Sequence, residues 1–261
     1  MRKTQLEDYR KKIDDYLEKS LPPTSKEPEI LHKAMRYSVF SGGKRLRPII
    51  VLAVGDITGV EHKQLLPVAC GLELIHNFSL IHDDLPSMDN DDYRRGKLTC
   101  HKKFGEPIAI LAGDALLTLA FEILAESDNC SLIKAVANAT GSVGMAGGQV
   151  FDMCNKDLQV SDCFKRKINN WKTGKLFQIC FEAPLYFNEI PEEDKHTITR
   201  ISQYFGEAFQ LRDDIEDKEG NITNMKKETE TLYKKMKEEL VYFKEKGGLL
   251  NYINEKLFEV E

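Results

Sequence analysis

Hydrophobic residues recur along this chain with the period of an α-helix, and alternation of apolar and polar positions is scarce. One segment carries two apolar stripes and is therefore apolar on most sides, as expected for a helix in the middle of a bundle. The first stripe is Leu65, Val68, Leu72 and Ile75, and the second is Leu74, Phe78 and Ile81. Segments 107–125 and 130–147 have the same character, so we expect buried helices there as well.

Two other segments, 2–19 and 226–246, are amphipathic and charged, which predicts helices on the outside of the bundle. Short breaks rich in proline and glycine separate the predicted helices. They fall at Pro22-Pro23, Gly42-Gly43, Pro67, Gly105 to Pro107, Pro184, Pro191 and Gly247-Gly248. None of them is long enough to link two domains. We therefore predict one all-α domain over residues 1–261, with about ten helices.

Composition narrows the possible functions. Of 261 residues, 41% are hydrophobic and 30% are charged, which is enough to bury a sizeable core. The net charge is −5 and no basic stripe stands out, so we expect no nucleic-acid partner. Six cysteines form no C-x-x-C pair, which argues against a zinc site and for free thiols.

The chain is expected to be a cytoplasmic protein without stable membrane insertion. Its first twenty residues lack the apolar core of a signal peptide. The most apolar stretch, Pro107 to Leu124, is interrupted by Gly113, Asp114 and Glu122. It therefore reads as a buried helix and not as a membrane span.

An acidic cluster follows the predicted core helix, in the sequence IHDDLPSMDNDDYRRG at residues 81–96. Carboxylates gathered at the end of a buried helix repel one another unless a cation neutralises them. An all-oxygen ligand set suits Mg²⁺, which takes one or two carboxylates together with phosphate oxygens. A solubilising acidic turn is the alternative, and the apolar flanks argue against it. The cluster contains Asp83, Asp84, Asp89, Asp91 and Asp92, followed by Arg94 and Arg95.

Pro86 lies between Asp83 and Asp89, which are six residues apart. On a straight helix these two side chains would point about 120° apart. Proline removes a backbone donor and distorts a helix. We therefore predict that residues 85–88 leave regular helix and let Asp89 turn back toward Asp83.

A second acidic cluster ends another apolar run, in QLRDDIED at residues 210–217. Asp213 and Asp217 are four residues apart and share a helix face, with Asp214 beside them. Alone, this pattern is weak, because a surface helix produces it by chance. Together the two clusters can share metal ions, and a diphosphate that bridges those metals is the natural ligand.

Basic residues occur where such an anion would need them. The segment GGKRLRP, residues 42–48, places flexible backbone beside three cations: Lys44, Arg45 and Arg47. His76 lies two helical turns before Asp83, where a hydrogen-bonded core histidine is the common alternative. Gly174, after Lys172 and Thr173, interrupts an apolar pattern and predicts a kink.

These motifs together resemble the trans-isoprenyl diphosphate synthases, the polyprenyl synthetase family, from about Leu31 to Gly220. Besides the segments above, the likeness includes RRG at 94–96, HKKFGEPIAILAGDALL, GGQVFD at 147–152 and KTGKLF. The first motif, six residues with an inserted proline, resembles bacterial farnesyl diphosphate synthases and plant geranylgeranyl enzymes. The family implies an all-α homodimer with a deep central cavity in each subunit.

By this resemblance, the aspartates surround about three Mg²⁺ ions, with Mn²⁺ as a substitute. The implied catalytic residues are Asp83, Asp84, Asp89, Asp213, Asp214, Asp217 and Lys172. Of these, the implied metal ligands are Asp83, Asp84, Asp89 and Asp213. The implied residues for isopentenyl diphosphate are Lys44, Arg47, His76 and Arg95. Those for the allylic diphosphate are Arg94, Lys172, Thr173, Gln210 and Lys227.

The implied reaction is ionisation of the allylic diphosphate, attack by isopentenyl diphosphate, and loss of a proton. Phe78, five residues before the first motif, resembles the aromatic stop of farnesyl enzymes. Geranyl or geranylgeranyl diphosphate synthase is the near alternative. A terpene cyclase shares the first motif but lacks GGKRLRP and the second one. A degenerate regulatory subunit is the non-enzyme alternative.

The chain departs from the family pattern after Gly220. A K-x-T-Y segment that family members carry is missing, and the C-terminal region is shortened. Lys227 stands where a loop lysine is expected, with Lys226 in place of its glycine. The alternative of a weakened subunit rests on this departure.

Overall fold

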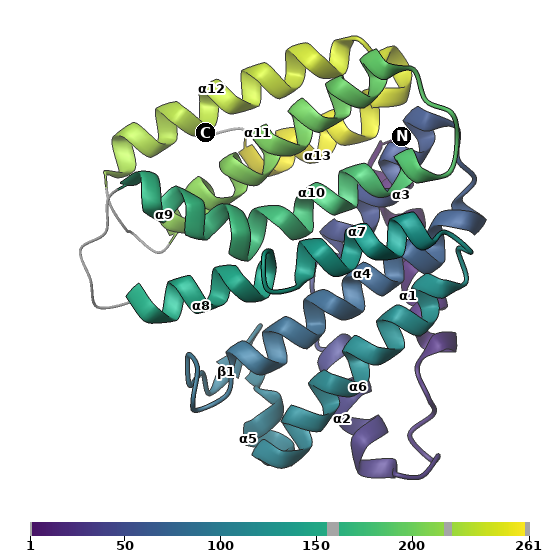
Figure 1. Cartoon of the computed structure of the whole chain (residues 1–261), viewed down its shortest axis with the longest axis vertical. Coiled ribbons are helices and arrows are strands. Elements are labelled where there is room, and N and C mark those ends of the chain that lie inside the picture. The colour runs from purple at the N-terminus through teal and green to yellow at the C-terminus, as the bar shows by residue number, and fades with distance from the viewer. Residues whose placement is uncertain (1, 156–161, 217–220, 259–261) are drawn as a thin grey trace. The chain divides into compact units, whose positions relative to one another are not determined.

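The structure, a computed structural model, describes residues 2–155, 162–216 and 221–258. Within these ranges the chain is almost wholly helical, which confirms the all-α prediction (Figure 1). The α-helices are α1 Arg2–Ser20, α2 Glu29–Val39, α3 Leu46–Thr58, α4 His62–Asp83, α5 Cys100–Phe104, α6 Glu106–Ala125, α7 Cys130–Thr140, α8 Met145–Asn155, α9 Asp162–Asn169, α10 Lys175–Glu182, α11 Glu192–Glu216, α12 Ile222–Val241 and α13 Gly248–Phe258.

Short elements complete the chain. A π-turn, Asn170–Gly174, joins α9 to α10, and 3₁₀ turns lie at Ala183–Tyr186 and Lys244–Gly247. The strands β1 (Tyr93–Arg94) and β2 (Lys97–Leu98) pair antiparallel as a small hairpin. The chain folds into two compact units. The first unit consists of residues 8–49 and 63–128, and the second consists of the other described residues.

In the first unit, α4 is the core helix that the two apolar stripes predict. Leu65, Val68, Leu72, Leu74 and Ile75 are fully buried. Helix α6 lies antiparallel against α4, as two glycine contacts show (Figure 1). A Cβ on Gly71 of α4 would lie 2.8 Å from Leu124 Cγ, and one on Gly113 of α6 would collide with the His82 imidazole. The acidic end of α4 is thereby fixed on a rigid support.

In the second unit, α10, α11 and α13 meet around an aromatic cluster. Phe205 of α11 has its ring centroid 5.1 Å from Phe177, 5.3 Å from Phe181 and 5.3 Å from Phe258. All four side chains are buried. Helix α12 runs beside α11, where Arg200 donates to Glu239 Oε1 at 2.7 Å (Figure 1). The acidic end of α11 therefore extends from a packed core.

Three predictions about local structure are wrong. Segment 130–147 is not one helix, because α7 ends at Thr140 and α8 begins at Met145. Gly144 makes that break tight, since a Cβ there would collide with the Ala139 carbonyl. Pro67 does not interrupt the chain but lies inside α4. The outer helix predicted to reach residue 246 ends at Val241.

Candidate functional site

The turn after α4 brings the two outer aspartates of the first motif together. Helix α4 ends at Asp83, and residues 84–89 form a non-helical turn. The Asp89 N–H donates to the Asp83 carbonyl at 2.9 Å, and Asn90 N–H closes the loop onto Leu85 O at 3.1 Å. This confirms that residues 85–88 leave regular helix. Asp83 is half-buried and Asp89 is exposed.

Asp84, by contrast, is turned toward protein groups. Its side chain is buried, and Arg94 Nε donates to Asp84 Oδ1 at 2.6 Å. Arg94 also reaches Asp91 Oδ2 at 3.3 Å. Burial raises the pKa of Asp84, and the charge of Arg94 offsets only part of that effect. Asp84 therefore orients Arg94 in this structure.

Arg95 sits in the turn of the β-hairpin, with the left-handed φ of 54° that such a turn requires. Its guanidinium donates to the Gly42 carbonyl and packs on Gly43. A Cβ on Gly43 would lie 2.7 Å from Arg95 Nη1, and the φ of Gly43 is +125°. Only glycine therefore permits this contact between the GGKRLRP segment and the RRG segment.

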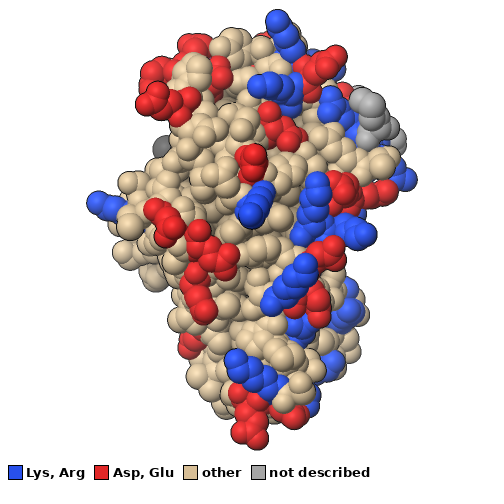
Figure 2. All heavy atoms as spheres, turned by 90° about the vertical axis from the view of Figure 1, so that its right-hand side faces the viewer, with Lys and Arg blue, Asp and Glu red and all other residues tan. Residues whose placement is uncertain are grey.

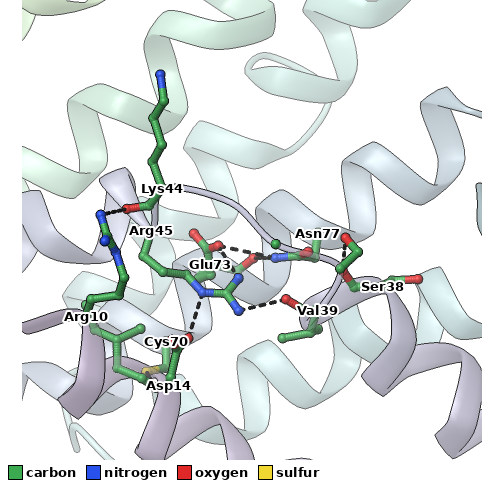
Figure 3. Close-up of polar contacts among 12 residues, drawn as sticks. Arg10, Asp14, Ser38, Val39, Lys44, Arg45, Cys70, Glu73 and Asn77 are labelled. Carbon is green, nitrogen blue, oxygen red and sulfur yellow. Dashed lines mark hydrogen bonds and ion pairs between the residues drawn. The ribbon is translucent and has the colours of Figure 1, made fainter. Parts of the chain in front are cut away.

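His76 lies half-buried on α4 among the same arginines. Burial, and then the charges of Arg47, Arg95, Arg94 and Arg45, lower the pKa of His76 well below its ordinary value. The imidazole is therefore neutral at neutral pH. Three of the four residues predicted for isopentenyl diphosphate gather here: Arg47, His76 and Arg95. The fourth, Lys44, is exposed on the adjacent loop and points away from Arg45 (Figure 3).

Arg45 does not join the ligand-facing cations, contrary to the reading of GGKRLRP as three cations around an anion. It is 5% exposed, and its guanidinium binds Asp14, Glu73 and the Val39 carbonyl. Sequence reasoning missed this inward role. The one available signal was Glu73, a carboxylate between apolar neighbours of the core helix, which needs a buried partner.

In the second unit, the predicted kink is the π-turn Asn170–Gly174. Such turns are frequent at functional sites. Lys172 Nζ donates to Asp152 Oδ2 of α8 at 2.5 Å, and Thr173 is half-buried. Helix α8 packs closely here, because a Cβ on Gly148 would collide with the Lys172 main-chain nitrogen. Glycine at 148 thus sets the position of the π-turn.

The second acidic cluster occupies the last turn of α11. Gln210 Nε2 donates to Asp214 Oδ1 at 2.9 Å, and both residues line a cavity of about 850 Å³ together with Gly174. Asp213 is half-buried beside them. Asp217 lies outside the described residues. Lys227 is exposed in α12, about 160° around the helix from buried Thr229, so it lies on the solvent-facing side of α12.

The acidic residues fit a magnesium ion in their chemistry. Among the residues that the structure describes, no three His, Cys, Asp or Glu side chains already converge on one point. Mg²⁺ does not require this, because it keeps several waters and takes one or two carboxylates plus phosphate oxygens. Asp83 and Asp89 supply carboxylates of that kind in the first unit, and Asp213 supplies one in the second.

Comparison with known proteins places these features in a family. The model of the family described as Polyprenyl synthetase matches residues 28–241, which include every site residue predicted above. The chain belongs to the polyprenyl synthetase family. The resemblance inferred from the motifs is thereby confirmed.

Other members of the polyprenyl synthetase family agree along most of the chain. A farnesyl diphosphate synthase of Bacillus subtilis is 48% identical over 202 residues, 74% of this chain and 68% of that protein. A geranylgeranyl diphosphate synthase of Cyanophora paradoxa is 37% identical over 278 aligned residues, 94% of this chain and 91% of that protein.

Solved structures of the family share the fold. A geranyltransferase from Legionella pneumophila superposes with a TM-score of 0.93 at 34% identity, covering 99% of this chain and 97% of that one. An FPP/GFPP synthase from Zymomonas mobilis gives a TM-score of 0.91 at 34% identity, with 98% of each chain covered. The polyprenyl synthetase fold thus extends over nearly all of this chain.

Proposed function

We propose that this chain is a magnesium-dependent prenyl transferase that joins isopentenyl diphosphate to dimethylallyl or geranyl diphosphate and yields farnesyl diphosphate. The observation that carries the proposal is the turn after α4, whose backbone bond joins Asp89 to Asp83 in a chain of the polyprenyl synthetase family. The family match crosses both compact units, so we treat residues 1–261 as one working domain.

The aspartates at the two helix ends would hold the metal. Asp83 and Asp89 in the first unit, and Asp213, Asp214 and Asp217 in the second, are the candidate set, with Asp84 acting through Arg94 as well. Magnesium bound there would stabilise negative charge on the departing diphosphate. Mn²⁺ accepts similar oxygen ligands and is a reasonable substitute.

Isopentenyl diphosphate would bind at the basic cluster of the first unit. Arg47 and Arg95 present guanidinium forks, and Lys44 on the exposed loop adds a third cation. Neutral His76 would donate a hydrogen bond without adding charge. This arrangement fixes the diphosphate and leaves the double bond to point into the apolar interior.

The allylic diphosphate has candidate partners in both units. Arg94, Lys172, Thr173 and Gln210 are its candidate partners in the two units. Cations fixed before ionisation stabilise the leaving group without reorganising during the reaction. No side-chain nucleophile is required, and the released diphosphate can take the final proton.

Phe78 is the candidate stop for chain growth. Its ring meets His82 edge to face, at 4.8 Å between centroids, so its orientation is restricted. Replacing Phe78 by Ala should lengthen the product beyond farnesyl, and an enzyme that still stopped at farnesyl would remove this role from Phe78.

We also propose a cytoplasmic homodimer. Helices α4 and α6 are long and apolar enough to cross a membrane by length and composition, and 67% and 39% of their apolar windows are buried. Helix α6 leaves Ile110 and Leu111 exposed, which suits a second copy of the chain. Acidic and basic side chains alternate on the face seen in Figure 2, in keeping with small-molecule partners and not nucleic acid.

The decisive experiment is a product assay. The purified chain receives isopentenyl diphosphate with dimethylallyl, geranyl or farnesyl diphosphate, with Mg²⁺ and then with a chelator. We expect farnesyl diphosphate from the first two primers and no product after chelation. A geranyl or geranylgeranyl product would reassign the chain length. Absence of any product would favour the regulatory subunit, an alternative that rests on the missing K-x-T-Y segment after Gly220.

A further inference from the structure

The segment that carries Lys44 and Arg47 has a backbone that needs external support. Gly42 and Gly43 have φ of +115° and +125°, and Arg45 has a φ of 51°. A left-handed conformation is uncommon for a residue with a Cβ and persists only when neighbouring structure imposes it. Contacts around Arg45 must therefore hold this backbone conformation in place.

Arg45 supplies it through three bonds to three different helices (Figure 3). Nε donates to Asp14 Oδ1 of α1 at 2.8 Å, Nη1 to Glu73 Oε1 of α4 at 2.9 Å, and Nη2 to the Val39 carbonyl at the end of α2 at 2.7 Å. The planar guanidinium is suited to such a divergent set, because its donors are fixed in one fork. Side-chain anchoring of this kind holds the main chain at residue 45.

Two neighbouring groups complete the anchor. Glu73 is 2% exposed, and Asn77 Nδ2 donates to its carbonyl at 2.8 Å. Arg10 of α1 reaches the Lys44 carbonyl at 3.4 Å. Burial disfavours the charge of Arg45, but Glu73 and Asp14 outweigh it and raise the pKa of the guanidinium. Arg45 thus stays charged inside the protein.

The anchored segment leads directly to the basic cluster. Arg45 O accepts the Ile49 N–H at 3.1 Å and so opens α3, on whose first turn Arg47 lies. On the other side, Gly42 and Gly43 receive Arg95. Glu73 lies three residues before His76 on the same helix. The buried Arg45–Glu73 ion pair therefore links the segments that carry the four residues of the basic cluster. These are Lys44, Arg47, His76 and Arg95.

We propose that Arg45 is a positioning residue for isopentenyl diphosphate, acting through Lys44, Arg47 and Arg95 without touching the substrate. This inference rests on the proposed function. It predicts that loss of Arg45 weakens the isopentenyl diphosphate site selectively and leaves the allylic site, built in other segments, nearly unchanged.

The test compares a single and a double variant. R45M leaves the Glu73 charge buried without its partner, which can unfold the protein. The double variant R45M/E73L removes both charges and should keep the melting temperature close to that of the wild type. We expect the double variant to raise the KM for isopentenyl diphosphate about tenfold or more, with the KM for geranyl diphosphate changed less than about twofold.

The conservative R45K variant adds a second check, because lysine keeps the charge but lacks the fork. It should restore stability more than it restores the KM. The matched control is R200M, which breaks a two-bond pair with Glu239 between α11 and α12. It should lower the melting temperature without separating the two KM values.

A normal KM for isopentenyl diphosphate in R45M/E73L, or equal changes in both KM values, would overturn the positioning role. Calorimetric binding of isopentenyl diphosphate separates this result from failure of the proposed function. If the wild type makes no product but binds isopentenyl diphosphate more tightly than R45M/E73L, the positioning role stands and the proposed activity falls. If neither protein binds it, both are wrong.

Discussion

The two acidic helix ends of this protein are built in different ways. At the end of α4, the chain itself makes the site: backbone bonds close the turn of Asp83 and Asp89, and Arg94 and Arg95 follow within a few residues. At the end of α11, the side-chain bonds described run along the helix itself, from Gln210 to Asp214 and from Arg212 to Glu216, and a cavity lies beside Gln210 and Asp214.

This difference separates local from distant determinants of function. The α4 end is specified by a continuous stretch of sequence, so substitutions within it should act on chemistry directly. The α11 end lines a cavity together with groups from other elements, such as Gly174 on the π-turn and Met225 on α12. Substitutions that move those elements should damage it indirectly.

The largest effect is expected at Asp83. Replacing it by Asn should lower kcat by roughly 10³-fold, because the proposed magnesium site would lose one carboxylate. Stability should not fall, since a negative charge at a helix C-terminus is unfavourable. Activity with Mg²⁺ and the melting temperature are measured together.

The matched control for this variant is Asp92→Asn in the same acidic run. Asp92 is exposed and pairs with Lys102, so its loss should change kcat less than about threefold. Equal losses in the two variants would show that the run acts only through its total charge.

The π-turn offers the next largest effect. Gly148→Ala should displace Lys172, because the added Cβ collides with its main-chain nitrogen, and kcat/KM for the allylic substrate should fall about 10²-fold. Gly206→Ala is the control. Its Cβ would lie 3.5 Å from Gly174 Cα, an ordinary contact, so activity should be nearly normal. Similar activities for both variants would contradict a tightly placed turn.

A smaller effect concerns pH and the basic cluster near the α4 end. The lowered pKa of His76 means that the unfolded chain binds a proton near the ordinary value of 6.5 while the folded chain does not. Stability is therefore fully present above about 6.5 and falls as pH is lowered below it, by at most about 1.4 kcal/mol per pH unit. His76→Gln should lose this dependence.

Urea unfolding from about pH 8 to about pH 5 measures this difference in the free energy of unfolding. Exposed His196 provides the control, because His196→Gln should follow the wild-type curve. Parallel curves for the wild type and the His76→Gln variant would mean that His76 takes up its proton in the folded protein.

The smallest effect is expected at Lys227. Since Lys227 lies on the solvent-facing side of α12, Lys227→Ala should change kcat/KM by less than about threefold. A loss of tenfold or more would show that α12 turns this lysine toward the allylic diphosphate during turnover, and that the α11 end is completed from the C-terminal side.

Local signals in the sequence were sufficient for the main features. The stripes of residues 65–81 identified the core helix, Pro86 located the turn between Asp83 and Asp89, and Gly174 marked the π-turn. Each of these depends on neighbours within about two helical turns. The family motifs added the site residues that such patterns could not assign.

Long-range contacts were beyond that reach. No residue close to Arg45 in the sequence indicates that its guanidinium binds Asp14 and Glu73, which are far away along the chain, and is buried there. The pairing of Asp84 with Arg94 depends on a hairpin of two-residue strands, too short for a recognisable alternation. The break between α7 and α8 arises from a close turn at Gly144, in a segment whose composition favours helix throughout.

The spacing of side chains along helix α4 also bears on the proposed product length. Phe78 lies five residues before Asp83 on α4, so the proposed chain-length residue is about 7.5 Å from Asp83 along the helix axis. Leu74 lies four residues before Phe78, about 6 Å farther along the axis. In such a protein, product length would depend on which turn of α4 carries the blocking side chain. Exchanging side chains along one face of α4 would therefore change the length of the product.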